Sequence, residues 1–137
     1  MKRLYLDTNI FIDILIDRDL DNLSLKMLTP YLEHSQVYMS VLSVHITYYS
    51  LRVKPNSSED KMIKKILSLI NLIPLDIPIM QKSLDCFKTD FEDTLQYFSA
   101  LSEECDYILT KDTKDFTKIK SISPSNIQII KNLRKLT

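Results

Sequence analysis

The sequence has no glycine among its 137 residues. Loops that wrap a phosphate or a dinucleotide depend on glycine, because only a residue without a Cβ lets the backbone approach the ligand closely. Walker-type ATPases and Rossmann dehydrogenases are therefore excluded, and the nucleophile elbow of the α/β-hydrolases is excluded for the same reason. Any chemistry on a phosphate must use side chains or a metal ion.

Cysteine and histidine are also scarce. Cys86 and Cys105 form no CxxC pair, and His34 and His45 are too few for a zinc site of the usual spacing. We expect both cysteines to be reduced thiols of the core. No apolar run reaches the roughly 18 residues that a membrane-spanning helix needs, and the N-terminus lacks a signal-peptide pattern. These patterns predict a cytoplasmic protein without membrane association, folded as one domain over residues 1–137.

The charges balance at 18 basic and 18 acidic residues. A net charge of zero argues against a uniformly basic surface for nucleic acid. The charges are unevenly distributed, however, because acids predominate over 1–33 and lysine and arginine over 111–137. This asymmetry fits either one basic face or a solvated C-terminal helix.

Short apolar runs alternate with stretches of helical periodicity. Thr8 or Asn9 is the expected N-cap of the first helix, and Pro30 should kink or divide the second. The segment after residue 110 reads as turn-rich, with a last helix over 125–135. Strands are predicted over 3–6, 36–40, 72–76 and 106–110, and the other helices over 9–17, 23–34, 42–52, 58–71, 78–87 and 90–104. This alternation predicts an α/β fold, a three-layer α/β/α sandwich with a mainly parallel sheet of four to five strands.

Aspartates follow two of the predicted strands. Asp7 ends the first strand, and Asp112 and Asp115 follow 106–110. Asp93 lies in the first turn of the preceding helix, with Asp90 one turn earlier. Parallel strands bring such groups to one sheet edge, where clustered carboxylates suit Mg²⁺ or Mn²⁺. Each aspartate taken singly also fits a helix cap or a surface position.

Three motifs in this order resemble the PIN-domain family, most closely its bacterial toxin-type members. They are LDTNIFIDIL at 6–15, FEDTLQYFSAL at 91–101 and DYILTKDTKDF at 106–116. The resemblance implies a metal-dependent endoribonuclease that prefers single-stranded RNA and is held inactive by an antitoxin. It also implies a homodimer.

The resemblance assigns roles to particular residues. It implies that Asp7, Asp93 and one or both of Asp112 and Asp115 are catalytic carboxylates that bind Mg²⁺ or Mn²⁺. The polar positions Thr8, Asn9 and Thr110 would order the site. Lys111 and Lys114 are candidates for holding a phosphate, although solvated loop lysines fit them equally.

One position departs from the family pattern. Ile46 stands where the family usually has a glutamate, and isoleucine cannot bind a metal. Glu92 or Asp90 could supply the missing charge, or the site is inactive. His45 is a poor substitute, because neighbouring residues on a helix point about 100° apart, and we expect it in the core or at its rim.

Three functions are therefore weighed: a ribonuclease, a PIN-fold module that binds RNA or protein without catalysis, and a receiver-like phosphoacceptor domain using Asp76. The motif order favours the ribonuclease. Tyr48, Tyr49, Tyr97 and Phe98 could stack on bases, but their helical spacing favours core packing.

Overall fold

The computed structural model describes residues 2–16 and 25–133. Its centre is a five-stranded sheet in which every pairing is parallel, in the order β3-β2-β1-β4-β5. The strands are β1 (Leu4–Leu6), β2 (Val37–Ser40), β3 (Asn71–Ile73), β4 (Tyr107–Leu109) and β5 (Gln128–Ile130). The chain passes from β1 to one side and later returns to β4 on the other, so strand order reverses between β1 and β4. In open parallel sheets, functional groups gather at the carboxyl ends of strands beside this point.

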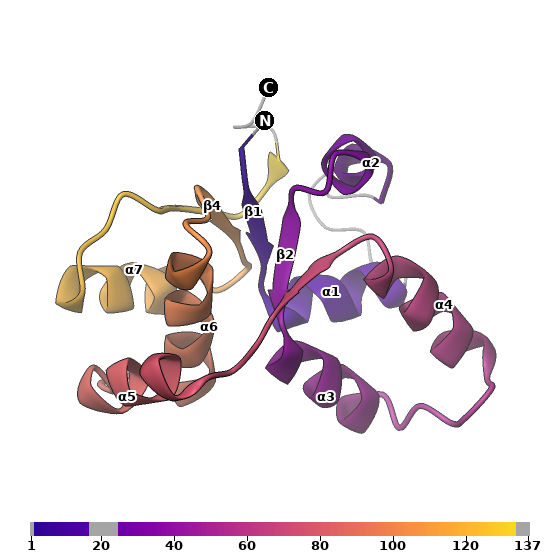
Figure 1. Cartoon of the computed structure of the whole chain (residues 1–137), viewed down its shortest axis with the longest axis horizontal. Helices are drawn as coiled ribbons and strands as arrows, with labels where there is room; N and C mark the ends of the chain where they lie inside the picture. The colour runs from indigo at the N-terminus through magenta and orange to yellow at the C-terminus, as the bar shows by residue number, and fades with distance from the viewer. Residues whose placement is uncertain (1, 17–24, 134–137) are drawn as a thin grey trace.

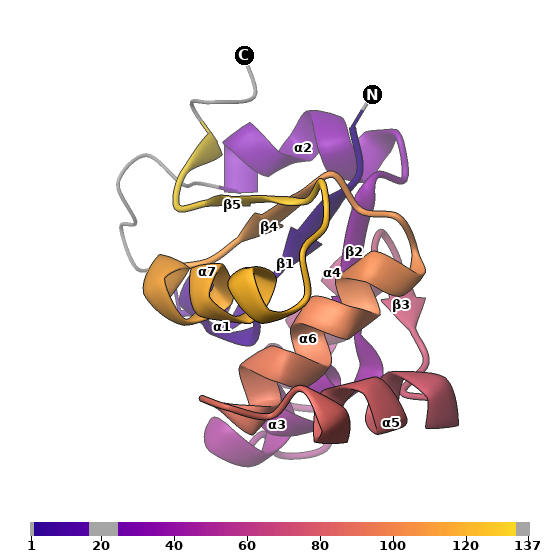
Figure 2. The ribbon, with the colours of Figure 1, turned by 90° about the vertical axis from the view of Figure 1, so that its left-hand side faces the viewer.

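Helices cover both faces of the sheet (Figure 1). The first face is covered by α1 (Thr8–Leu15), α2 (Leu25–Glu33) and α4 (Ser58–Leu67). The second is covered by α5 (Ile77–Asp85), α6 (Phe91–Ser102) and α7 (Thr113–Ile122), which lie in front of the sheet in Figure 2. Helix α3 (Val41–Ser50) starts at the end of β2 and places residues against both core clusters. The predicted three-layer α/β/α sandwich is confirmed.

Alternation along β1 explains why the sheet has a core on each side. Leu4 and Leu6 point into the cluster under α1, α2 and α4, whereas Tyr5 points into the cluster under α5, α6 and α7. All three are at most 1% exposed. A strand covered on both faces reads as a continuous apolar run, as Leu4–Leu6 does here.

The C-terminal prediction was wrong. Turns were expected over 111–116, but α7 begins at Thr113 and continues to Ile122, with Phe116 and Ile119 fully buried at helical spacing. Residues 128–130, expected to be helical, form β5 and pair with β4. The apolar residues of 127–133 fit either period, and burial beside β4 selects the strand.

Several boundaries also differ from the prediction. Asp7 and not Thr8 or Asn9 is the N-cap of α1, and its side chain makes no capping hydrogen bond. Pro30 lies within one helix rather than dividing it. Helix α4 ends at Leu67, four residues before β3 begins at Asn71. The expected helix ends at 17, 23 and 135 lie outside the described residues.

The aromatic residues divide between core and surface. Tyr97 and Phe98 are buried as predicted, and Tyr48 is half-buried against the first cluster. Tyr49 is 79% exposed, so its expected core position was wrong. His45 is also exposed and stacks on the Tyr49 ring, with centroids 6.3 Å apart. Cys105 is buried and Cys86 half-buried, both as free thiols.

Candidate metal centre

The predicted aspartates meet at the carboxyl edge of the sheet where strand order reverses. The backbone N–H of Asp7 donates to the Leu109 carbonyl at 3.0 Å, which holds the end of β1 beside the end of β4. Asp93 arrives from the first turn of α6, where the Asp90 side chain caps the helix by accepting from the Asp93 N–H at 2.9 Å. Asp112 and Asp115 come from the start of α7.

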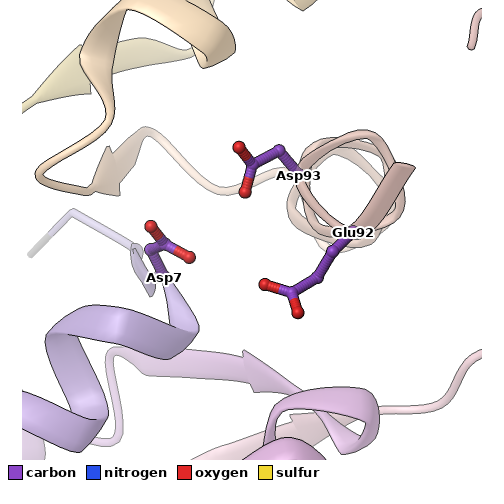
Figure 3. Close-up of side chains that lie close together, drawn as sticks. All are labelled: Asp7, Glu92 and Asp93. Atoms are coloured by element: carbon purple, nitrogen blue, oxygen red, sulfur yellow. The ribbon is translucent and has the colours of Figure 1, made fainter. Parts of the chain in front are cut away.

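The carboxylates form two groups that share Asp93. Oxygen atoms of Asp7, Glu92 and Asp93 lie within 4.8 Å of one another, and so do oxygen atoms of Asp93, Asp112 and Asp115. Figure 3 shows Asp7, Glu92 and Asp93 pointing into the same space between α1 and α6. We name these five residues the acidic cluster. Glu92, a less certain ligand from the sequence, belongs to the first group, whereas Asp90 belongs to neither.

Burial and mutual repulsion raise the pKa values within the acidic cluster. The pKa of Asp93 is raised to about 8, first by burial and then by the charges of Asp7, Asp90 and Asp112. Burial also raises the pKa of Asp7 and of Glu92, whereas the pKa of Asp115 is raised mainly by its hydrogen bond to Asp112. A bound cation would lower these four pKa values, because it favours the charged form of each carboxyl group.

The two oxygens of Asp7 have separate neutral donors. Gln96 Nε2 donates to Oδ1 at 2.9 Å, and Thr110 Oγ1 donates to Oδ2 at 2.8 Å. Thr110 Oγ1 in turn accepts from the Asp112 N–H at 2.8 Å, which links Asp7 to the start of α7. Asp7 is only 1% exposed, so these bonds fix a carboxylate that would otherwise be costly to bury.

The other predicted site residues differ in burial and in their contacts. Thr8 is buried, and its hydroxyl shares a 2.6 Å hydrogen bond with that of Ser43 on α3. Asn9 is exposed on the first turn of α1. Lys111 forms an ion pair with the buried Asp13 of α1, which ties the loop after β4 to that helix. Lys114 is exposed.

The composition of the acidic cluster suits a hard divalent cation. The atoms that it offers to a cation are all carboxylate oxygens, the ligands that Mg²⁺ prefers. The ion pairs of Lys64 with Asp60 and of Lys111 with Asp13 both lie outside the acidic cluster. Asp7 and Asp93 are buried, and buried carboxylates that lie close together are stabilised when a cation neutralises them, so the residues fit Mg²⁺ or Mn²⁺.

Sequence reasoning missed Gln96 and Ser43. Gln96 is fully buried at i+3 from Asp93 and bonds directly to Asp7, and Ser43 contacts both Thr8 and Gln96. The signal was a glutamine in the mostly apolar stretch 95–100. Asp76 caps α5 by accepting from the Ile79 N–H at 3.0 Å, which gives it a structural role.

The fold and the site together define an α/β protein with an acidic cluster at the sheet's switch point. A family model described as "PIN domain" matches residues 3–114. The chain therefore belongs to the PIN-domain family. This finding rules against the hypothesis of a receiver-like phosphoacceptor domain. No curated protein matches the chain.

Solved structures share this fold. The crystal structure of VapBC2 from Rickettsia felis bound to a promoter DNA fragment has a TM-score of 0.71 at 16% identity and covers 93% of this chain and 96% of that one. FitAcB from Neisseria gonorrhoeae gives 0.64 at 16% identity, with the same coverage of both chains. A toxin-antitoxin complex from Klebsiella pneumoniae gives 0.61 at 20% identity, covering 93% and 95%. At these identities the likeness establishes the fold.

Within the described residues, no helix has the length and apolar character needed to cross a membrane.

Proposed function

We propose that this PIN-domain protein is a metal-dependent endoribonuclease that hydrolyses phosphodiester bonds in single-stranded RNA. The observation that carries the proposal is the convergence of carboxylate oxygens in two groups of three around Asp93, each within 4.8 Å. Such an arrangement has a high electrostatic cost unless a cation occupies it. The repulsion between these carboxylates lowers the stability of the protein, so stability gives no reason to bring them together. Their convergence therefore points to a functional role.

Asp7 and Asp93 would hold Mg²⁺ or Mn²⁺, with Glu92, Asp112 and Asp115 as further ligands. When bound, the metal supplies Lewis acidity for phosphodiester hydrolysis. Because the pKa of Asp93 is raised to about 8, metal binding at neutral pH must release the proton of this carboxyl group to solvent. Thr110 and Gln96 keep the Asp7 oxygens in place while this exchange occurs.

Loss of the usual glutamate favours the second candidate, a PIN-fold module that binds RNA or protein without catalysis. Ile46 is half-buried on α3, one turn after Ser43, and contributes no ligand. Glu92 offsets this loss, because its carboxylate reaches Asp7 and Asp93 from α6. The charge available to a cation is therefore retained, which supports the catalytic candidate.

The proposed partners are RNA, a cognate antitoxin protein and a second copy of the chain in a cytoplasmic homodimer. Support for the antitoxin comes from the Rickettsia VapBC2 structure and from the Klebsiella toxin-antitoxin complex, which share the fold. In this scheme the protein is the toxin of the pair.

The test is cleavage of a random-sequence pool of end-labelled single-stranded RNA in Mn²⁺, compared with EDTA. We expect Asp93→Asn to lower cleavage by on the order of 100-fold or more, because several kcal/mol of transition-state stabilisation are lost. Asp85→Asn, at an exposed aspartate on α5, is the matched control and should cleave like the wild type. Chelator-resistant RNA binding without cleavage would favour the binding module instead.

A further inference from the structure

Gln96 is a buried side chain that contacts the acidic cluster through Asp7. It is on α6, one turn beyond Asp93, and has no exposed surface. Its Nε2 donates to Asp7 Oδ1 at 2.9 Å. Its Oε1 accepts from the Thr8 N–H at 3.1 Å and from the Tyr5 hydroxyl at 3.2 Å. A fully buried amide with partners at both ends has a fixed orientation.

Its partners allow only one orientation of the amide. The Thr8 N–H can only donate, so it must face Oε1, whereas an ionised Asp7 can only accept and must face Nε2. The Tyr5 hydroxyl also accepts from the Ser40 N–H at 3.3 Å, which leaves its proton for Oε1. Gln96 therefore connects Asp7 to Tyr5 of β1 and to Thr8 at the start of α1, and through Tyr5 to the end of β2.

A neutral donor is suited to a metal ligand. Each oxygen of Asp7 accepts a side-chain hydrogen bond, Oδ1 from Gln96 and Oδ2 from Thr110, and a carboxylate oxygen has a second acceptor position. A lysine in place of Gln96 would neutralise Asp7 and repel a cation. The amide stabilises and orients the carboxylate without adding positive charge.

We propose that Gln96 is a positioning residue: it holds the Asp7 carboxylate in the orientation that receives a divalent cation. This inference rests on the proposed metal site. Residues that hydrogen-bond to metal ligands typically change metal affinity by about 10–100-fold when they are replaced. Gln96 acts through Asp7 and does not itself contact the cation.

The first test compares Gln96→Met with Tyr97→Phe by Mn²⁺ binding, measured by electron paramagnetic resonance, and by urea unfolding. Methionine keeps the length of the side chain and removes the amide. Tyr97 is the matched control, because it is equally buried on the same helix but its hydroxyl bonds to Ser123 and Ser125, outside the acidic cluster. We expect both variants to lose stability, but only Gln96→Met to weaken Mn²⁺ binding, by about 10-fold or more.

A second measurement needs no variant. In wild-type protein with ¹⁵N-labelled glutamine, Mg²⁺ should shift the side-chain amide signal of Gln96 with the affinity of the metal site. The signal of Gln81, exposed on α5, should not move. This result decides the question even if Gln96→Met does not fold.

The outcomes separate the two proposals. If the wild type binds metal while Gln96→Met binds it equally, or while the Gln96 amide signal stays still, the positioning role is overturned and the metal site stands. If Tyr97→Phe weakens Mn²⁺ binding as much as Gln96→Met, the effect is one of general stability and the positioning role is again overturned. If the wild type binds neither Mn²⁺ nor Mg²⁺, both proposals fail.

Discussion

Replacing Asp93 by asparagine should stabilise the metal-free protein. Asp93 is 6% exposed, and its pKa is raised to about 8 by burial and by neighbouring carboxylates. An unfolded chain titrates its aspartates near pH ~3.9. The pKa of Asp93 is higher in the folded protein than in the unfolded chain, so protonation of Asp93 stabilises the folded state. This stabilisation is complete below the unfolded pKa and is lost as the pH rises through about 8. Asparagine carries no charge at any pH and avoids this loss.

The size of the effect follows from the same shift. One pKa unit corresponds to about 1.4 kcal/mol, so an isolated group would lose about 4 kcal/mol between pH 5 and 8. Neighbouring carboxylates contribute to this shift as well as burial, so part of this free energy depends on them and not on Asp93 alone. We therefore expect Asp93→Asn to gain about 1–3 kcal/mol at pH 8 and less than about 1 kcal/mol at pH 5. At roughly 3 °C per kcal/mol, the melting temperature should rise by several degrees at pH 8.

The assay is thermal unfolding followed by circular dichroism in EDTA at pH 5, 6.5 and 8, with Asp85→Asn as the control. Saturating Mn²⁺ should reverse the order of stability, because a ligand at about 100 times its Kd stabilises the wild type by about 2.7 kcal/mol and the variant has lost a ligand. The reasoning is refuted if Asp93→Asn is less stable than the wild type at pH 8 without metal, or if the difference does not depend on pH.

Three further perturbations test other parts of the structure. Ile46→Glu should place a carboxylate one turn from Ser43, strengthen Mn²⁺ binding about tenfold and destabilise the metal-free protein; calorimetry that shows unchanged affinity would contradict this. Tyr48→Phe removes the 2.7 Å hydrogen bond that is the largest cause of the lowered pKa of Asp60. Stability from a lowered pKa is present above the unfolded value and lost in acid, so the variant should be less stable in melts at pH 7 and equal to the wild type near pH 2. Burial raises the pKa of Cys105 to about 12, so a thiol reagent at pH 8 should label Cys86 first, and equal rates would be inconsistent with the packing.

Long periodic segments and strand ends could be predicted from the sequence, because burial and chain direction determine them locally. Asp7 and Asp112 follow strands, and parallel pairing then brings them to one edge without further information. Short elements near the C-terminus could not be predicted in this way. Strand β5 has three residues whose structure depends on the open edge of β4, a contact distant in sequence.

The hydrogen-bond network around the acidic cluster was beyond sequence reasoning for a related reason. Gln96 owes its role to Tyr5, Thr8 and Asp7, which are about ninety positions away in the chain. Lys111 was a candidate either for holding a phosphate or for a solvated loop position, and the structure adds an ion pair with Asp13, whose burial a pattern of charges does not reveal. The residue types in the sequence indicated that carboxylates could bind a metal. Which side chains hydrogen-bond or pair with one another depended on the folded structure.

The most direct test of the metal centre is anomalous diffraction at the manganese edge from crystals soaked in Mn²⁺. The account predicts a peak bonded to carboxylate oxygens of both Asp7 and Asp93, which is lost in Asp7→Asn crystals. Manganese bound elsewhere on the protein, with no peak between these two carboxylates, would contradict it.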